Sequence, residues 1–117
     1  MSANAVADKM RQLKPVGPDV TLDINVEINR PPMVRDDKVA QLLHRAQQSA
    51  AAVGLVLEEA PPTGGASDAN FTSAVGVPSI DGLGADGDGA HTWSEHVLVS
   101  TLLTRTRLWH HLLTHLD

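Results

Sequence analysis

Two consecutive prolines, Pro31 and Pro32, constrain the fold of this chain more than any other feature of its sequence. Neither residue has an N–H group to donate to a β-ladder, and Pro31 also holds the preceding Arg30 in an extended geometry. No regular element can therefore continue through this point. The prolines predict a domain boundary, with one unit at residues 1–32 and a second at residues 33–117.

The segment before the prolines predicts one helix and one strand. Apolar residues recur at helical spacing from Val6 to Leu13, and Pro15 then prevents the helix from continuing. From Val20 to Ile28, apolar and polar residues alternate strictly, which is typical of a strand with one wet face. A lone helix and strand bury too little surface to form a core, so we expect this pair to be the end of another domain.

The segment after the prolines carries three helical patterns. An apolar stripe indicates a helix that begins after Asp36 or Asp37 and is closed by Gly54. A shorter helix is expected to open at Ala66 or Ser67, to run through Val75 and to stop at Gly76. A long amphipathic helix is expected to begin at residue 94 or 95 and to run almost to the last residue.

Short apolar runs between these helices predict buried strands. Residues 55–57 and 77–80 show no alternation, which suits strands covered on both faces, as in parallel sheets. A glycine-rich, acidic loop follows at residues 81–90. The order of elements therefore predicts an α/β fold.

Composition narrows the classes of partner. The formal net charge is −5 and the sequence has no cluster of Lys and Arg, which argues against a nucleic-acid or acidic-membrane partner. The chain contains no cysteine, so any metal must be held by His, Asp or Glu. It also contains no uninterrupted apolar run long enough for a signal peptide or a membrane span. We expect a soluble, cytoplasmic protein.

The glycine-rich loop ends in a histidine with the chemistry of a zinc ligand. Glycines let the backbone turn sharply beside a ligand, and His91 closes the loop. Glu95 follows one helical turn later and is placed to orient the other ring nitrogen of His91, although a surface loop with a helix-capping Glu95 has the same pattern. His111 and His115 also lie four residues apart, but their place near a helix end favours a role in complementing the helix dipole.

A second candidate site lies before the helix at 67–75. The sequence Gly65-Ala66-Ser67 precedes free N–H groups that can attract an anion such as a substrate carboxylate, although a glycine before a capping residue is also ordinary turn chemistry. Arg30, held at a strand end by Pro31, can grip a carboxylate with two N–H groups, whereas the default for such an arginine is solvent exposure.

Three motifs together resemble one enzyme family. They are T-G-G-A-S-D-A-N-F at residues 63–71, G-V-P-S-I-D-G-L-G at 76–84 and G-A-H-T-W-S-E-H-V at 89–97. In this order they are similar to the C-terminal catalytic segment of the zinc metallopeptidases that include glutamate carboxypeptidase, acetylornithine deacetylase and succinyl-diaminopimelate desuccinylase. The N-R-P-P-M run at residues 29–33 extends the resemblance upstream, so that it covers nearly the whole chain.

The resemblance implies an architecture and a reaction. Residues 1–32 would be the last helix and strand of a ferredoxin-like lid, or dimerisation, domain, and residues 33–117 the C-terminal part of an α/β/α catalytic domain. The family hydrolyses an amide bond beside a carboxylate in a small peptide or N-acyl amino acid. It uses two zinc ions bridged by an aspartate and water, with a glutamate as general base, and family members of this kind can form homodimers.

The resemblance also assigns residues. His91 would be the C-terminal zinc ligand with Glu95 beside it, Gly65, Ala66 and Ser67 would bind the substrate carboxylate, and Arg30 would be the lid-domain arginine that holds it. Ala66 departs from the family where some members carry threonine, which would remove a side-chain contact there.

The remaining family ligands and the general base lie N-terminal to the matching segment. Because a catalytic zinc needs about three protein ligands, the isolated chain is expected to be an inactive C-terminal piece that works with the missing N-terminal catalytic half. A different class of function is a non-catalytic α/β interaction or anion-binding module. Zinc uptake distinguishes the two.

Overall fold

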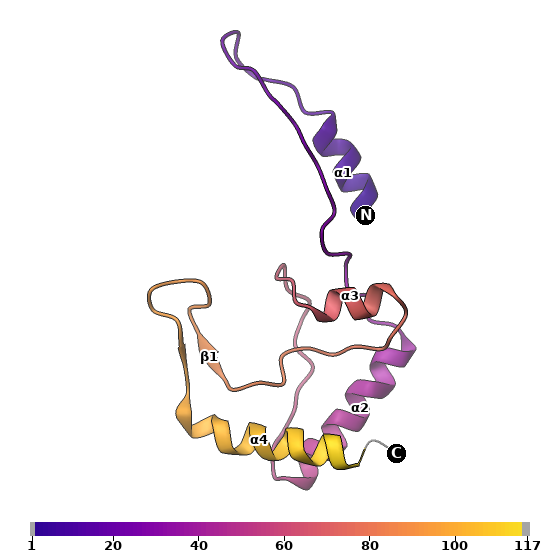
Figure 1. Cartoon of the computed structure of the whole chain (residues 1–117), viewed down its shortest axis with the longest axis vertical. Helices are drawn as coiled ribbons and strands as arrows, with labels where there is room; N and C mark the ends of the chain where they lie inside the picture. The colour runs from indigo at the N-terminus through magenta and orange to yellow at the C-terminus, as the bar shows by residue number, and fades with distance from the viewer. Residues whose placement is uncertain (1, 116–117) are drawn as a thin grey trace.

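The computed structural model describes residues 2–115, which form four helices and one hairpin (Figure 1). Met1, Leu116 and Asp117 lie outside this range, and so does the end of the last helix, which is predicted to run almost to the C-terminus. In chain order the elements are α1 (Ala3–Arg11), α2 (Asp37–Ala52), α3 (Ala69–Ala74), β1 (Gly87–Asp88), β2 (His96–Val97) and α4 (Val99–Thr114).

The two ends of α2 follow from the local sequence, as predicted. The Asp36 side chain accepts a hydrogen bond from the Val39 N–H at 2.9 Å and so caps the helix start. At the other end Gly54 has φ +76°, and the N–H groups of Gly54 and Leu55 donate to the carbonyls of Ala51 and Ala50. This is a Schellman ending, in which a left-handed glycine satisfies the last carbonyls of the helix.

The three predicted strands are wrong for the described residues. Segments 20–28, 55–57 and 77–80 have no β-ladder partner, and the sheet that forms is the antiparallel pair of β1 and β2. Alternation predicts an extended course, but a strand also requires a neighbouring backbone to pair with. The regular elements within residues 2–115 are therefore mostly helices, joined by one two-stranded hairpin, and the parallel strands of the predicted α/β arrangement do not form there.

The predicted lid segment keeps its extended course without a ladder. Figure 1 shows the chain after α1 turning back as a long trace beside the helix. Nη2 of Arg11 donates to the carbonyl oxygen of Val26 at 3.0 Å, which joins the two. The Val26 carbonyl, which would accept from a backbone N–H in a β-ladder, accepts here from the Arg11 side chain.

The last helix begins later than its amphipathic pattern predicts. His96 pairs with Asp88 and Val97 with Gly87, so these residues belong to the hairpin and α4 starts at Val99. Thr101 Oγ1 donates to the Leu98 carbonyl at 2.7 Å in the first turn of the helix.

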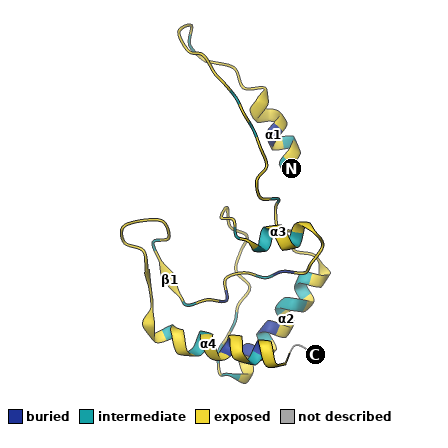
Figure 2. Ribbon diagram, viewed as in Figure 1, coloured by how far each residue is buried: buried dark blue, intermediate teal, exposed yellow. Residues whose placement is uncertain are grey.

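The core lies where α2 meets α4, and Figure 2 shows a buried stretch on each of these two helices where they meet. Small side chains on α2 allow the helices to approach, and Leu108 of α4 is fully buried against them. Partly buried residues of segments 55–57 and 77–80 pack on this centre from outside. The buried cluster consists of Ala46, Ala50, Leu83, Leu108 and Leu112.

The molecule exposes far more surface than its mass requires. Its accessible area is 9332 Å², whereas a compact monomer of 12.4 kDa has about 6,100 Å². The radius of gyration is 19.2 Å, compared with about 13 Å for a compact domain of this length. Large apolar side chains therefore remain in solvent, which indicates surfaces suited to association. On and beside α4 the exposed ones include Leu98, Leu102, Leu103, Trp109 and Leu113.

Candidate functional site

Arg30 lies against the start of α3. Its Nη2 is 3.0 Å from Oδ1 of Asp68, the residue before the helix, and its guanidinium carbon lies 5.2 Å from the centre of the Phe71 ring. The Arg30 side chain is 34% exposed and Asp68 is 90% exposed, so the ion pair is open to solvent. The structure thus brings a predicted carboxylate-binding arginine to the loop that was predicted to bind the same group.

Asn70 joins the two segments of this site. Its Nδ2 donates to the Pro31 carbonyl at 2.8 Å, and its Oδ1 accepts from the Ser67 N–H at 2.8 Å. One amide group therefore ties the proline break to the loop before α3. Asn70 and Pro31 each lie in a motif of the sequence, but nothing in either motif predicts that they bond to each other across 39 positions.

The loop before α3 presents donors to solvent. Gly65 and Ala66 are exposed, and no described residue accepts a hydrogen bond from their backbone N–H groups. Ser67 differs, because its N–H is bonded to Asn70 and its Oγ accepts from the Ala69 N–H at 3.0 Å. Ser67 is left with its hydroxyl proton as the donor for a ligand. The loop and Arg30 together offer the donors that a carboxylate needs.

His91 lies in the loop that joins β1 to β2 and is exposed. Its φ is +65°, a left-handed conformation that costs a non-glycine residue about 1 kcal/mol. The His91 N–H donates to Oε2 of Glu95 at 3.3 Å, which supports this turn. Glu95 thus contacts the backbone of His91, whereas the predicted contact was with the ring.

The two groups of predicted site residues are not joined to each other. No hydrogen bond or ion pair links the His91 loop with the Arg30 and Ser67 region within residues 2–115. In Figure 1 the β1–β2 loop stands well to the side of α3. The chain therefore holds two separate parts of the predicted site.

The described residues do not make a metal site by themselves. No group of three or more His, Cys, Asp or Glu side chains converges anywhere in residues 2–115. The exposed His91 imidazole has the donor chemistry of a zinc ligand but supplies one of about three protein ligands that catalytic zinc requires. His111 and His115 stack with ring centres 4.1 Å apart, and Nδ1 of His115 faces the His111 carbonyl.

One exposed ion pair braces the start of α2. Nε of Arg35 lies 2.5 Å from Oε1 of Glu59, the second residue after segment 55–57. The hydrogen bond from Arg35 lowers the pKa of the Glu59 carboxyl, and the same bond raises the pKa of Arg35. This pair holds together the two ends of the segment that contains α2.

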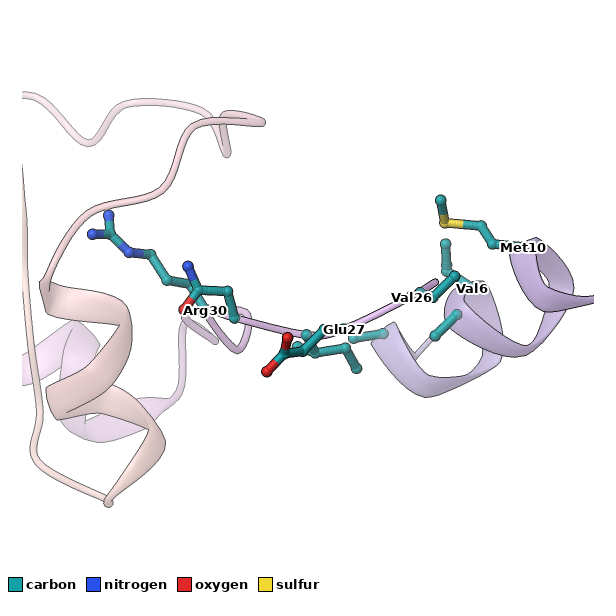
Figure 3. Close-up of a pocket in the computed structure, with 9 residues that line it drawn as sticks. Val6, Met10, Val26, Glu27 and Arg30 are labelled. Carbon is teal, nitrogen blue, oxygen red and sulfur yellow. The ribbon is translucent and has the colours of Figure 1, made fainter. Parts of the chain in front are cut away.

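A groove lies between α1 and the extended segment that leads to Arg30 (Figure 3). It has a volume of about 350 Å³ and an apolar lining of Val6, Met10, Val26 and Ile28. Figure 3 shows the Arg30 side chain directed away from Val6 and Met10. Arg30 also lines one end of the groove, so the groove and the carboxylate site adjoin at this residue.

The chain matches a known family of peptidases. The sequence profile of Peptidase family M20/M25/M40 matches residues 5–115. No curated protein and no solved structure matches the chain. None of the helices within residues 2–115 has the length and hydrophobicity to cross a bilayer.

Proposed function

The chain belongs to Peptidase family M20/M25/M40, and from this we propose that it supplies part of the active site of a zinc-dependent amidohydrolase. The reaction is hydrolysis of an amide bond next to a carboxylate in a small peptide or N-acyl amino acid. His91 is one zinc ligand with Glu95 beside it. Arg30, Gly65, Ala66 and Ser67 bind the substrate carboxylate.

The observation that carries this proposal is the approach of Arg30 to the loop before α3. These residues are separated by more than thirty positions, yet Nη2 of Arg30 lies 3.0 Å from the Asp68 carboxylate beside Ser67. The Asp68 carboxylate contacts one nitrogen of the Arg30 guanidinium, which has five N–H donors in all. A substrate carboxylate can share or replace this partner and can also meet the free N–H groups of Gly65 and Ala66.

The zinc part of the proposal requires polypeptide outside this chain. His91 contributes one imidazole, and the remaining ligands and the general base come from an N-terminal catalytic half. When bound in such a site, zinc lowers the pKa of its water and polarises the carbonyl of the scissile bond. The isolated chain is accordingly inactive. Its exposed apolar surface supports association with the missing half.

The domain assignment forms part of the same proposal. Residues 1–32 are the end of a lid or dimerisation domain, and residues 33–117 belong to the catalytic domain. The long extended trace beside α1 and the separate α2–α4 core support this division (Figures 1 and 2). A homodimer formed through the lid segment is compatible with the exposed apolar groove along α1.

Reconstitution tests the proposal. The chain is mixed with a family enzyme shortened to its N-terminal catalytic half, and bound zinc and amidase activity are measured. We expect both to rise in the mixture, and His91→Ala to reduce both. The matched control is His110→Ala, which removes an exposed histidine from α4 and should change neither. Carboxylate binding that persists without any gain in zinc or activity would contradict the enzyme assignment and favour a binding module.

A further inference from the structure

The hairpin that carries His91 is held on α4 through Asp86, the residue before β1. The Asp86 N–H donates to Thr101 Oγ1 at 3.0 Å, and the Asp86 carbonyl accepts from the Leu98 N–H at 2.7 Å. Its carboxylate Oδ1 lies 2.5 Å from Nη2 of Arg105. The backbone N–H, the carbonyl and the carboxylate of Asp86 are therefore each bonded to α4 or to Leu98, its N-cap residue.

Arg105 is unusually dependent on this contact. Its side chain is 15% exposed, and its Nε and Nη1 atoms are buried without an acceptor among residues 2–115. A guanidinium removed this far from water is costly unless an anion compensates it. The arginine distinguishes this pair from the exposed Arg11–Asp8 pair, which is worth little. Asp86 is 50% exposed and Asp8 64%, whereas Arg105 is 15% exposed and Arg11 51%. Among the described residues, Asp86 is therefore the anion that compensates the charge of Arg105.

The hairpin is too short to define its own direction. Each strand has two residues, and the described pairs are Gly87 with Val97 and Asp88 with His96. An isolated two-stranded hairpin is marginally stable in water. The direction of its loop must therefore come from the elements to which its base is attached.

We propose that Asp86 and Arg105 are positioning residues, whose ion pair fixes the angle of the hairpin on α4 and so sets where the His91 imidazole points. The consequence for catalysis rests on the proposed function of His91. The effect on the hairpin itself does not, because the ion pair acts with or without metal. Neither residue belongs to a sequence motif that would mark this role.

The distance between the hairpin loop and α4 measures the effect directly. Because the chain has no cysteine, Trp93→Cys and His110→Cys give a clean pair of spin-label sites, and both positions are exposed. Pulsed electron paramagnetic resonance of the metal-free chain yields the distance distribution. In the Asp86→Asn and Arg105→Gln backgrounds we expect the distribution to broaden by about twofold, since the hairpin is marginal alone.

Two further variants make the test specific. Arg107→Gln removes the same charge from an exposed position of α4 and should leave the distribution unchanged. The charge-exchanged double variant, Asp86→Arg with Arg105→Asp, should return the narrow distribution. An unchanged width in both Asp86→Asn and Arg105→Gln would overturn the proposal.

Folding is checked separately by far-ultraviolet circular dichroism. If Arg105→Gln loses helix, the isosteric Asp86→Asn variant decides the outcome, because it keeps both backbone bonds of Asp86. The measurement uses neither zinc nor substrate. Unchanged distances would therefore contradict the role of Asp86 and Arg105 without affecting the proposed zinc role of His91. A failed reconstitution would contradict the zinc role without affecting the distance result.

Discussion

The side-chain amide of Asn70 donates to the carbonyl oxygen of Pro31 across 2.8 Å, and the same amide accepts from the N–H of Ser67. The proline break that ends the first unit is thereby bonded to the loop that opens α3. Arg30 precedes Pro31 directly, so this link determines how the guanidinium meets the loop. It is the clearest long-range polar connection of the candidate carboxylate site.

Replacing Asn70 should loosen this site. Asn70→Ala removes the donor to Pro31 and the acceptor for Ser67, and each partly buried bond is worth about 1 kcal/mol. We expect the unfolding midpoint in urea to fall and the amide signals of Gly65 and Ala66 to shift in nuclear magnetic resonance spectra. Asn25→Ala, at an exposed position, is the control. Equal behaviour of the two variants would mean that the link does not stabilise the loop.

Asp68 should compete with an external carboxylate for Arg30. Asp68→Asn removes the negative partner 3.0 Å from Nη2, while the exposed pair itself is worth up to about 1 kcal/mol. The affinity for N-acetylglutamate should therefore rise by about two- to fivefold. Arg30→Gln should abolish the binding, and titration calorimetry measures both effects. A weaker affinity in Asp68→Asn would show that the carboxylate of Asp68 assists binding instead of competing with it.

The Arg35–Glu59 pair should give the chain a defined pH dependence. The hydrogen bond from Arg35 lowers the pKa of Glu59 below its ordinary value of 4.5. A carboxyl with a depressed folded pKa stabilises the fold above its unfolded pKa and loses this contribution as pH falls through the folded pKa. The contribution is therefore complete above pH 4.5 and disappears at lower pH.

Carbon-13 spectra of the Glu59 carboxyl measure this directly. We expect its titration midpoint below 4.5 in the parent chain and a return towards 4.5 in Arg35→Gln. High salt should reduce the difference, because the pair is exposed. Identical midpoints in the parent and Arg35→Gln would rule out the ion pair as the cause.

Gly54 should resist substitution because of its backbone and not its surroundings. Its φ is +76°, and a Cβ added there would meet no atom within 4 Å. Gly54→Ala should therefore cost about 1 kcal/mol of stability through backbone strain alone. Gly64→Ala is the matched control, since that site is equally open and has no positive φ. Chemical denaturation compares the two, and equal midpoints would refute the strain argument.

The candidate site was only partly accessible from sequence. Residue type and motif singled out Arg30, Ser67 and His91, each from its immediate neighbours. The ion pair of Arg30 with Asp68 and the bridge through Asn70 join positions 38 or more residues apart, and no local pattern encodes such a meeting. The turn of Glu95 towards the His91 backbone likewise depends on the left-handed φ of that residue.

The sequence by itself determined the features that arise within a few residues. Asp36 and Gly54 set the ends of α2, and the prolines stop the extended segment, because caps and dihedral limits are local. The tertiary structure decided which extended segments pair. Segment 20–28 alternates as a strand should, but a β-ladder needs a second backbone 4.7–4.9 Å away. In the described residues this segment has no such neighbour, and the carbonyl of Val26 accepts instead from the Arg11 side chain of α1.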